Sequence, residues 1–217
     1  MQSSETIIYQ GQFGEFTITD RDRREVKIYR GGLVISALSL LFGTSLFLWQ
    51  GATLLVLNAL TFLFASFALG LGISLLTIHI YLVPLHRLLQ VFWVIGTVFS
   101  AAIATSTATP LALSIYNRPF LLLGTGFLFA ALTGIYFKEA FCFNRLETKV
   151  LTPLVPILLL GFMAGVLPPE VSKILLFGWS ILFCIFALRK AFQNIPDDIG
   201  DKSVFTYLKN RQQQSET

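Results

Sequence analysis

Residues 31–86 read GGLVISALSL LFGTSLFLWQ GATLLVLNAL TFLFASFALG LGISLLTIHI YLVPLH, and this stretch decides the fold. It contains no Asp, Glu, Lys or Arg. A helix that spans a bilayer needs about 20 mostly apolar residues, so the stretch is long enough for two. Trp49-Gln50-Gly51 is the only polar break, and Trp49 would lie at the membrane interface. The alternative is one long span followed by an interfacial helix.

Four further charge-free runs follow along the chain. The last, residues 174–188, reaches spanning length if Lys173 and Arg189 extend their charged ends to the two interfaces. The sequence thus predicts an all-α fold, a polytopic membrane helix bundle. Its six transmembrane helices are expected at residues 32–49, 56–80, 88–106, 119–137, 150–167 and 172–190.

The composition agrees with a multi-pass integral membrane protein. Of 217 residues, 54% are hydrophobic and 13% are charged, whereas about a quarter are charged in a soluble domain. The mean hydropathy is +0.71. These values exclude a disordered chain, a disulfide-stapled secreted module and a typical cytosolic enzyme, since the charges are too few to cover a soluble surface.

Lys and Arg predict the orientation. With six spans, fourteen of the 16 basic residues fall on one side, and only Arg118 and Lys173 fall on the other. Basic residues collect on the cytoplasmic side, so both termini are expected to be cytoplasmic. This gives an N-terminal segment (1–30), a transmembrane domain (31–191) and a tail (192–217). The same bias accounts for the net charge of +4, and no motif indicates a nucleic-acid partner.

The two cytoplasmic ends have local patterns of their own. Gly11 and Gly14 separate two β-prone stretches, which indicates a short hairpin. Asp20 or Asp22 is a plausible N-cap for a basic juxtamembrane helix that would meet anionic lipid headgroups. No cationic start with an apolar core precedes this helix, so the first span is expected to act as an uncleaved anchor. Residues 201–212 could form an interfacial helix or a frayed tail.

Few residues could carry chemistry. His79 and His86 would lie two turns apart on one helix, about 10 Å, which is too far to ligate one ion together, and Pro84 between them is expected to bend or end that helix. His79 is a candidate axial ligand for a haem or pigment, although a helix-end histidine that bonds to its neighbours is the commoner case. Cys142 and Cys184 have no evident base beside them. The sequence therefore predicts no catalytic residue, metal site or cofactor, and no enzyme.

Small and polar residues within the spans indicate helix packing. Asn58 would hydrogen-bond to a neighbouring helix, and Gly161 and Gly165 form a GxxxG that favours close helix approach or a homodimer. A glycine stripe at Gly124, Gly126 and Gly134 suggests the same for the fourth span. Two prolines, at positions 153 and 156, are expected in the first turns of the fifth span, where the second would leave a kink.

The densest polar segment joins the fourth and fifth spans, at residues 138–149. Its Phe141 and Phe143 would press into the interface while Lys138, Glu139 and Arg145 face water. One reading is a membrane-hugging turn whose exposed ion pairs contribute little. The other is a docking surface for a membrane-protein partner.

Four short motifs can be compared with known families: Tyr9-Gln10-Gly11-Gln12-Phe13-Gly14-Glu15-Phe16, Asp22-Arg23, Tyr29-Arg30 and Lys138-Glu139-Ala140-Phe141-Cys142-Phe143. Together they resemble an uncharacterised integral-membrane family, a domain of unknown function found in cyanobacteria and chloroplasts. The resemblance implies a host with photosynthetic membranes, so the protein would lie in the plasma membrane or the thylakoid. It implies no reaction, ligand or site residue.

The expected function is non-enzymatic. No Asp, Glu, Lys or Arg lies at mid-membrane, where a buried ionisable group would mark a transport pathway. We therefore expect a structural, assembly or interaction role in the bilayer. The alternative is a small-solute transporter or channel without a buried ionisable residue, which would use hydroxyls, Asn58, His79 and broken backbone.

Overall fold

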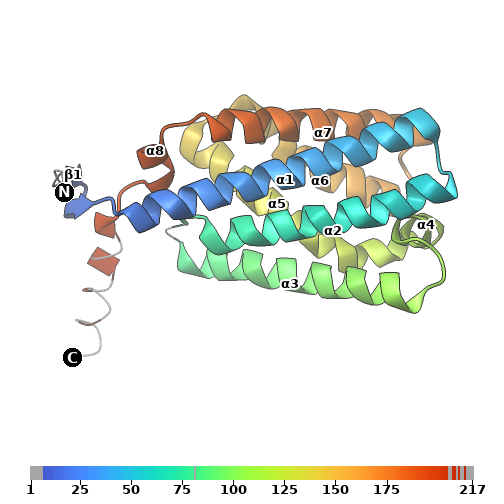
Figure 1. Ribbon diagram of the computed structural model, residues 1–217, viewed down its shortest axis with the longest axis horizontal. Helices are drawn as coiled ribbons and strands as arrows, with labels where there is room; N and C mark the ends of the chain where they lie inside the picture. The colour runs from blue at the N-terminus through green and yellow to red at the C-terminus, as the bar shows by residue number, and fades with distance from the viewer. Residues whose placement is uncertain (1–6, 81, 205–206, 209, 211–212, 214–217) are drawn as a thin grey trace, which may run out of the picture.

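The computed structural model describes residues 7–80, 82–204, 207, 208, 210 and 213. Two strands precede a series of helices (Figure 1). The elements are β1 (Ile8–Gly11), β2 (Gly14–Thr17), α1 (Asp20–Gln50), α2 (Leu54–Thr77), α3 (Val83–Ser106), α4 (Leu111–Asn117), the 3-10 helix η1 (Pro119–Leu121), α5 (Leu122–Phe143), α6 (Leu146–Met163), α7 (Pro169–Ala191) and α8 (Ile195–Ile199).

Six helices are long and apolar enough to cross a membrane, which confirms the predicted bundle. They are α1, α2, α3, α5 with η1, α6 and α7. The hairpin and α8 lie together at one end of the bundle, whereas α4 lies at the other (Figure 1). We call the end that carries the hairpin and α8 the basic end, because most Lys and Arg residues lie there.

α1 is one continuous helix that begins well before the first span. Thr19 is its N-cap and forms a capping box with Asp22, whose carboxylate accepts the backbone N–H of Thr19 at 2.8 Å. The expected cap was Asp20 or Asp22, and Asp22 instead occupies the third helical position. The helix continues without a break from the N-terminal segment (1–30) into the transmembrane domain (31–191), so the boundary between these two parts lies within α1.

The chain reverses between α1 and α2, so the alternative of one long span is wrong. Gly51 ends α1 with φ 70°, a conformation that a side chain would disfavour. Thr53 then accepts the backbone N–H of Val56 and starts α2. Trp49 is 81% exposed at this turn, which agrees with its expected interfacial position.

α1 and α2 approach each other closely through small residues, a feature that the sequence reading missed. A Cβ at Gly32 would clash with the carbonyl of Gly70, and a Cβ at Gly70 would clash with that of Gly32. Ser36 donates to the carbonyl of Phe67 at 3.0 Å, and Ser74 donates to that of Tyr29 at 2.9 Å. Two small-xxx-small pairs, one on each helix, therefore face each other.

The glycine stripe of α5 packs only in part as expected. A Cβ at Gly124 or Gly134 would overlap side chains of α3, whereas Gly126 faces open space. Gly96 of α3 lies against the backbone of Leu128. The contact between α3 and α5 therefore depends on glycines from both helices.

α5 and α6 are joined by only Asn144 and Arg145, so the expected loop at 138–149 is mostly helical. Asn144 reverses the chain with φ 53°, a left-handed conformation that asparagine tolerates. α6 consequently begins earlier than predicted, and Pro153 and Pro156 lie inside it rather than in its first turn. The expected helix start at Pro153 is wrong.

Gly161 and Gly165 lie at the end of α6 and do not bring two helices of this chain together; the predicted homodimer stays a prediction. Gly165 has φ 69°, its N–H bonds to the carbonyl of Phe162, and the N–H of Val166 bonds to that of Gly161. This is a Schellman motif, in which glycine supplies the left-handed residue after the helix. Asn58 also differs from expectation, since it lies on the exposed face of α2 rather than at a helix contact.

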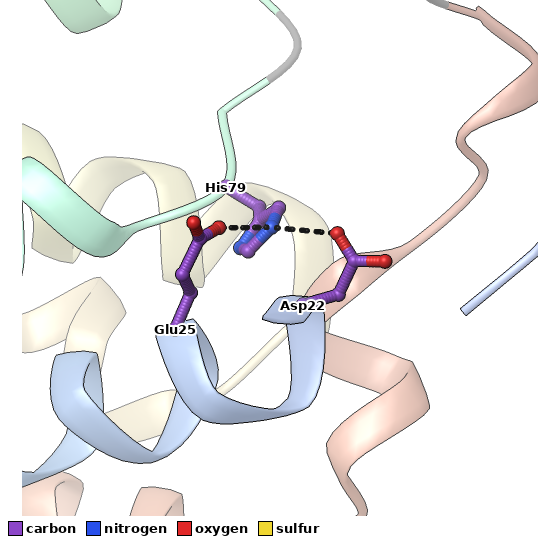
Figure 2. Close-up of side chains that lie close together, drawn as sticks. All are labelled: Asp22, Glu25 and His79. Carbon is purple, nitrogen blue, oxygen red and sulfur yellow. Dashed lines mark ion pairs between the residues drawn. The ribbon is translucent and has the colours of Figure 1, made fainter. Parts of the chain in front are cut away.

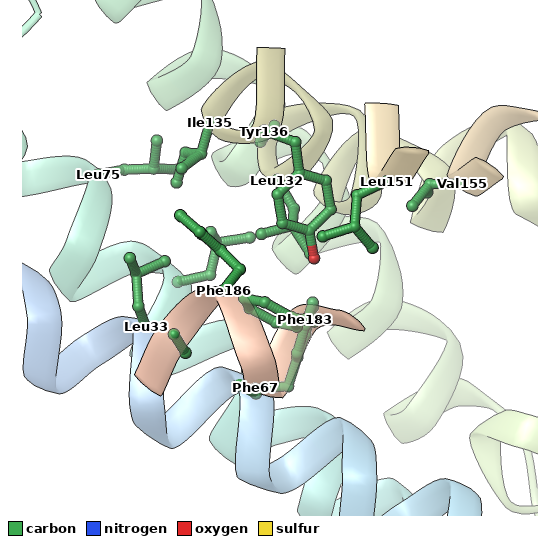
Figure 3. Close-up of a cluster of buried hydrophobic side chains, with 14 of the residues drawn as sticks. Leu33, Phe67, Leu75, Leu132, Ile135, Tyr136, Leu151, Val155, Phe183 and Phe186 are labelled. Carbon is green, nitrogen blue, oxygen red and sulfur yellow. The ribbon is translucent and has the colours of Figure 1, made fainter. Parts of the chain in front are cut away.

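The interior of the bundle is filled by large apolar and aromatic side chains (Figure 3). Leu33, Leu132, Tyr136, Phe183 and Phe186 are each at most 2% exposed and come from α1, α5 and α7. The Tyr136 and Phe183 rings pack edge-to-face, with their centroids 5.4 Å apart. α1, α5 and α7 are thereby packed around one common core.

The predicted hairpin is present and packs against the tail. Gly11 pairs with Gly14 across an antiparallel ladder. The backbone N–H of Gln12 donates to Asp201 at 2.6 Å, and that of Phe13 donates to Ser203 at 3.0 Å. The expected tail helix at 201–212 lies partly outside the described residues, whereas α8 was not predicted.

Candidate functional site

The basic end holds a chain of buried charges that connects four helices. Glu139 of α5 and Lys190 of α7 are fully buried, and Lys190 Nζ lies 2.6 Å from Glu139 Oε2. Lys190 also contacts the carboxylate of Asp198 on α8, which is 5% exposed. Arg30 of α1 closes the series, with Nε at 2.8 Å from Asp198 Oδ2. Charges of alternating sign thus link α1, α8, α7 and α5.

Arg30 also caps the C-terminal end of α7. Its guanidinium donates to the carbonyl of Ala191, the last residue of α7, at 3.4 Å, and to those of Gln193 at 2.6 Å and Asn194 at 3.1 Å just beyond the helix. The last carbonyls of a helix have no partner within it, and they form its negative pole. One buried cation therefore satisfies both the end of α7 and the carboxylate of α8.

Aromatic rings surround the pair of Glu139 and Lys190. Tyr29 donates its hydroxyl to Glu139 Oε1 at 3.3 Å, and Lys138 donates to the same oxygen at 2.8 Å. Lys190 Nζ lies 4.1 Å from the centroid of the Phe143 ring, a cation–π distance. Breaking such a fully partnered pair on one side leaves a buried charge without compensation.

The expected water exposure of Lys138, Glu139 and Arg145 is wrong. Glu139 is fully buried, and the side chains of Lys138 and Arg145 are each 11% exposed. The cause is that α5 continues to Phe143, which directs Glu139 toward α7 one turn before the helix ends. The large apolar residues exposed in this segment are Phe141, at 82%, and Leu146, at 74%. Docking at this turn stays a prediction, although the three charges that suggested it are not exposed to water as expected.

His79 lies in the connection between α2 and α3, beside two carboxylates of α1 (Figure 2). Its Nε2 is 3.5 Å from Glu25 Oε2 and 3.9 Å from Asp22 Oδ1. Asp22 and Glu25 share a face because they are three residues apart on a helix. Burial lowers the pKa of His79, and the two carboxylates only partly oppose this effect.

The remaining carboxylate oxygens of this cluster are already partnered. Lys202 donates to Asp22 Oδ2 at 2.7 Å, and Arg21 donates to Glu25 Oε1 at 2.8 Å. Asp22, Glu25 and His79 offer ligand atoms within 4.8 Å of one another, so they could hold a divalent cation. Since Lys202 and Arg21 already balance the two carboxylates, the cluster is also complete as an ion-pair network.

The expected common helix face for His79 and His86 is wrong. α2 ends at Thr77 and α3 begins at Val83, with proline at its second position, so a connection separates the two histidines. His86 Nε2 lies 2.7 Å from the carbonyl of Leu75. Carboxylates face Nε2 of His79, so that nitrogen is not directed at an open pocket for a macrocycle. A haem or pigment at His79 therefore has no geometric support.

A family comparison covers most of the site. The family model described as "Uncharacterized integral membrane protein (DUF2301)" matches residues 73–207. The chain belongs to the DUF2301 family. No curated protein and no solved structure matched the chain.

The residues matched by the DUF2301 model include most of the buried charges. Glu139, Lys190, Asp198 and His79 lie within the matched range, whereas Arg30 lies before it. The sequence reading had not identified Lys190, Asp198 or Arg30 as interacting residues. For Arg30 and Lys190 the available signal was a position at the edge of an apolar run, where a charge is either at the interface or buried against a partner, whereas Asp198 had no such signal.

Proposed function

We propose that this DUF2301 protein is a non-enzymatic membrane protein that acts by assembly or interaction with other membrane components. One observation carries the proposal: the middle of the bundle is closed by apolar side chains. Leu33, Leu71, Leu128, Leu132 and Phe183 are each fully buried. A passage for a polar solute needs polar groups or water along its length, and the side chains at these five positions are apolar.

The polar groups in the spans also support an interaction role. Ser36, Ser74 and Ser100 donate to helix carbonyls, so their hydroxyls serve the backbone. Cys142 is exposed at the basic end, and Cys184 donates to the carbonyl of Ala37. Among the residues that the structure describes, neither cysteine has a carboxylate or imidazole at hydrogen-bond distance to act as a base.

Orientation and membrane are part of the proposal. The excess of Lys and Arg at the basic end supports a cytoplasmic position for both termini. The resemblance of the sequence to proteins of cyanobacteria and chloroplasts supports a plasma or thylakoid membrane. The partner would then be the lipid bilayer together with another membrane protein or a second copy of this chain.

Cys142 provides the test. A photo-crosslinker attached to its exposed thiol, in native membranes, should yield a discrete adduct with another protein or with a second copy. The Cys142→Ser variant should form no such adduct. The control Ala52→Cys/Cys142→Ser moves the thiol to the other end of the bundle, so its crosslinked product should differ from that of Cys142. Recovery of the monomer alone, repeatedly and after gentle solubilisation, would argue strongly against an assembly role.

Transport remains the second candidate because of one observation, the buried pair of Glu139 and Lys190. Ionisable groups that pair between membrane helices often mark gates or ion pathways. If the protein is a transporter, proteoliposomes that contain the purified protein should show solute or proton flux, and Glu139→Gln should alter that flux. Absence of flux together with a stable crosslinked partner would leave the assembly role.

A further inference from the structure

An open groove of about 1000 Å³ lies between the first part of α1 and the segment that joins α7 to α8. Figure 1 places this segment beside α1 at the basic end. The groove is lined by residues from both sides. On α1 they are Arg23, Lys27, Arg30, Gly31, Val34 and Ile35, and opposite are Ala191, Gln193, Asn194, Ile195, Pro196 and Asp197.

The outer part of the groove carries two cations. Arg23 and Lys27 are four residues apart and therefore share a face of α1. Neither side chain has an ion-pair or hydrogen-bond partner among the residues that the structure describes. Arg30 is committed to Asp198 and to the end of α7. Asp197 is the one carboxylate of the lining, so the free cations outnumber it.

The inner part of the groove is apolar and unfilled. Beyond Arg30 the same helix face continues with Gly31, Val34 and Ile35, and Ile35 is 47% exposed. A Cβ at Gly31 would meet nothing within 4 Å, so the glycine leaves the floor of the groove open. From Arg23 to Ile35 the face extends about 18 Å along α1 and changes from cationic to apolar at the start of the first span.

We propose that this groove binds one anionic phospholipid. The phosphate would lie between Arg23 and Lys27, and one acyl chain would follow Gly31, Val34 and Ile35. Basic pockets between membrane helices at the cytoplasmic side are suited to anionic headgroups, because each nearby cation attracts the negative charge and the hydrocarbon seats the chain. A soluble phosphate would leave the apolar half of the groove without a ligand, so the two halves together specify a lipid.

The first experiment removes the cations. Native mass spectrometry of the full chain in detergent, titrated with phosphatidylglycerol, should show discrete one-lipid adducts, and phosphatidylcholine should compete poorly. Arg23→Gln/Lys27→Gln should weaken phosphatidylglycerol binding about 10-fold to 30-fold. The control Arg24→Gln/Arg87→Gln removes the same charge from the same end, outside the groove, and should bind normally. Equal weakening by both variants would reduce the effect to general surface charge and overturn the site.

The second experiment fills the apolar half without changing any charge. Gly31→Leu has open space for its side chain, so the bundle should keep its thermal stability. It should nevertheless displace the acyl chain and weaken phosphatidylglycerol binding several-fold, whereas Gly178→Leu, which also faces open space on α7, should not. Unchanged lipid binding by Gly31→Leu, or equal binding of water-soluble glycerol phosphate, would overturn the proposal.

Discussion

Glu139 and Lys190 form an ion pair of 2.6 Å in which both side chains are fully buried, although 51 positions separate them in the chain. The pair joins α5 to α7 at the basic end, and Asp198 extends it to α8. A buried charge that loses its partner costs far more than an exposed one, because the remaining charge has no water to stabilise it. Substitution of either partner is therefore expected to lower the stability of the protein strongly.

Lys190→Met should destabilise the protein by about 3–5 kcal/mol, because the carboxylates of Glu139 and Asp198 both lose their contact with Lys190. Glu139→Gln should cost less, because Lys190 keeps its contact with Asp198. The midpoint of thermal unfolding in detergent measures both. Glu170→Gln breaks an exposed pair with Lys173 and should change stability by less than about 0.5 kcal/mol. A Lys190→Met variant as stable as this control would show that the buried pair contributes little.

Gly70→Ala should loosen the contact between α1 and α2. The added methyl group would meet the carbonyl of Gly32, which cannot rotate away as a side chain can. The expected loss is about 1–3 kcal/mol by thermal unfolding. Gly126→Ala serves as the control because its methyl group enters open space. Similar melting of the two variants would contradict the close approach.

Gly165→Ala should destabilise the end of α6 by about 1–2 kcal/mol, since φ is 69° there. It should leave the oligomeric state unchanged, because both glycines of the GxxxG take part in the Schellman motif that ends α6. Gly161→Ile, examined by light scattering in detergent, separates the two interpretations. If that variant alone converts a dimer into a monomer, the homodimer predicted from GxxxG regains its support.

Stability should fall as the pH falls below about 6.5, in part through His79. Burial lowers its pKa in the folded protein, so the unfolded chain binds a proton first, and acid then favours unfolding. The loss begins near the ordinary histidine value of 6.5 and ends below the folded pKa. His79→Gln should flatten this part of the profile, and an unchanged slope would assign it to other groups.

The proposed orientation, with both termini in the cytoplasm, predicts which side labels each thiol. A membrane-impermeant maleimide should reach Cys142 only after the cytoplasmic side is opened, because that residue is exposed at the basic end. Ala52→Cys in a Cys142→Ser chain should label in intact cells. Labelling in the reverse order would place the termini outside and contradict the count of basic residues.

Much of the local structure followed from short-range patterns. The hairpin was predicted because Gly11 and Gly14 flank a turn between β-prone residues. Trp49 was expected at the membrane interface because of its chemistry, and it is exposed where α1 ends. By contrast, Asn58 was expected at a helix contact and lies on the exposed face, because a sequence shows that a residue is in a span but not which way it faces.

Sequence alone determined that the chain crosses a membrane six times, since each crossing requires about 20 apolar residues and such runs are directly visible. Only the tertiary structure decided which charges are interior. Glu139 was expected in water and is buried, because its exposure depends on the side of α5 that meets α7 and on where α5 ends. The Schellman role of Gly165 likewise depends on a backbone angle that the same letters do not specify. Span number depends on composition, whereas burial depends on how the spans face one another.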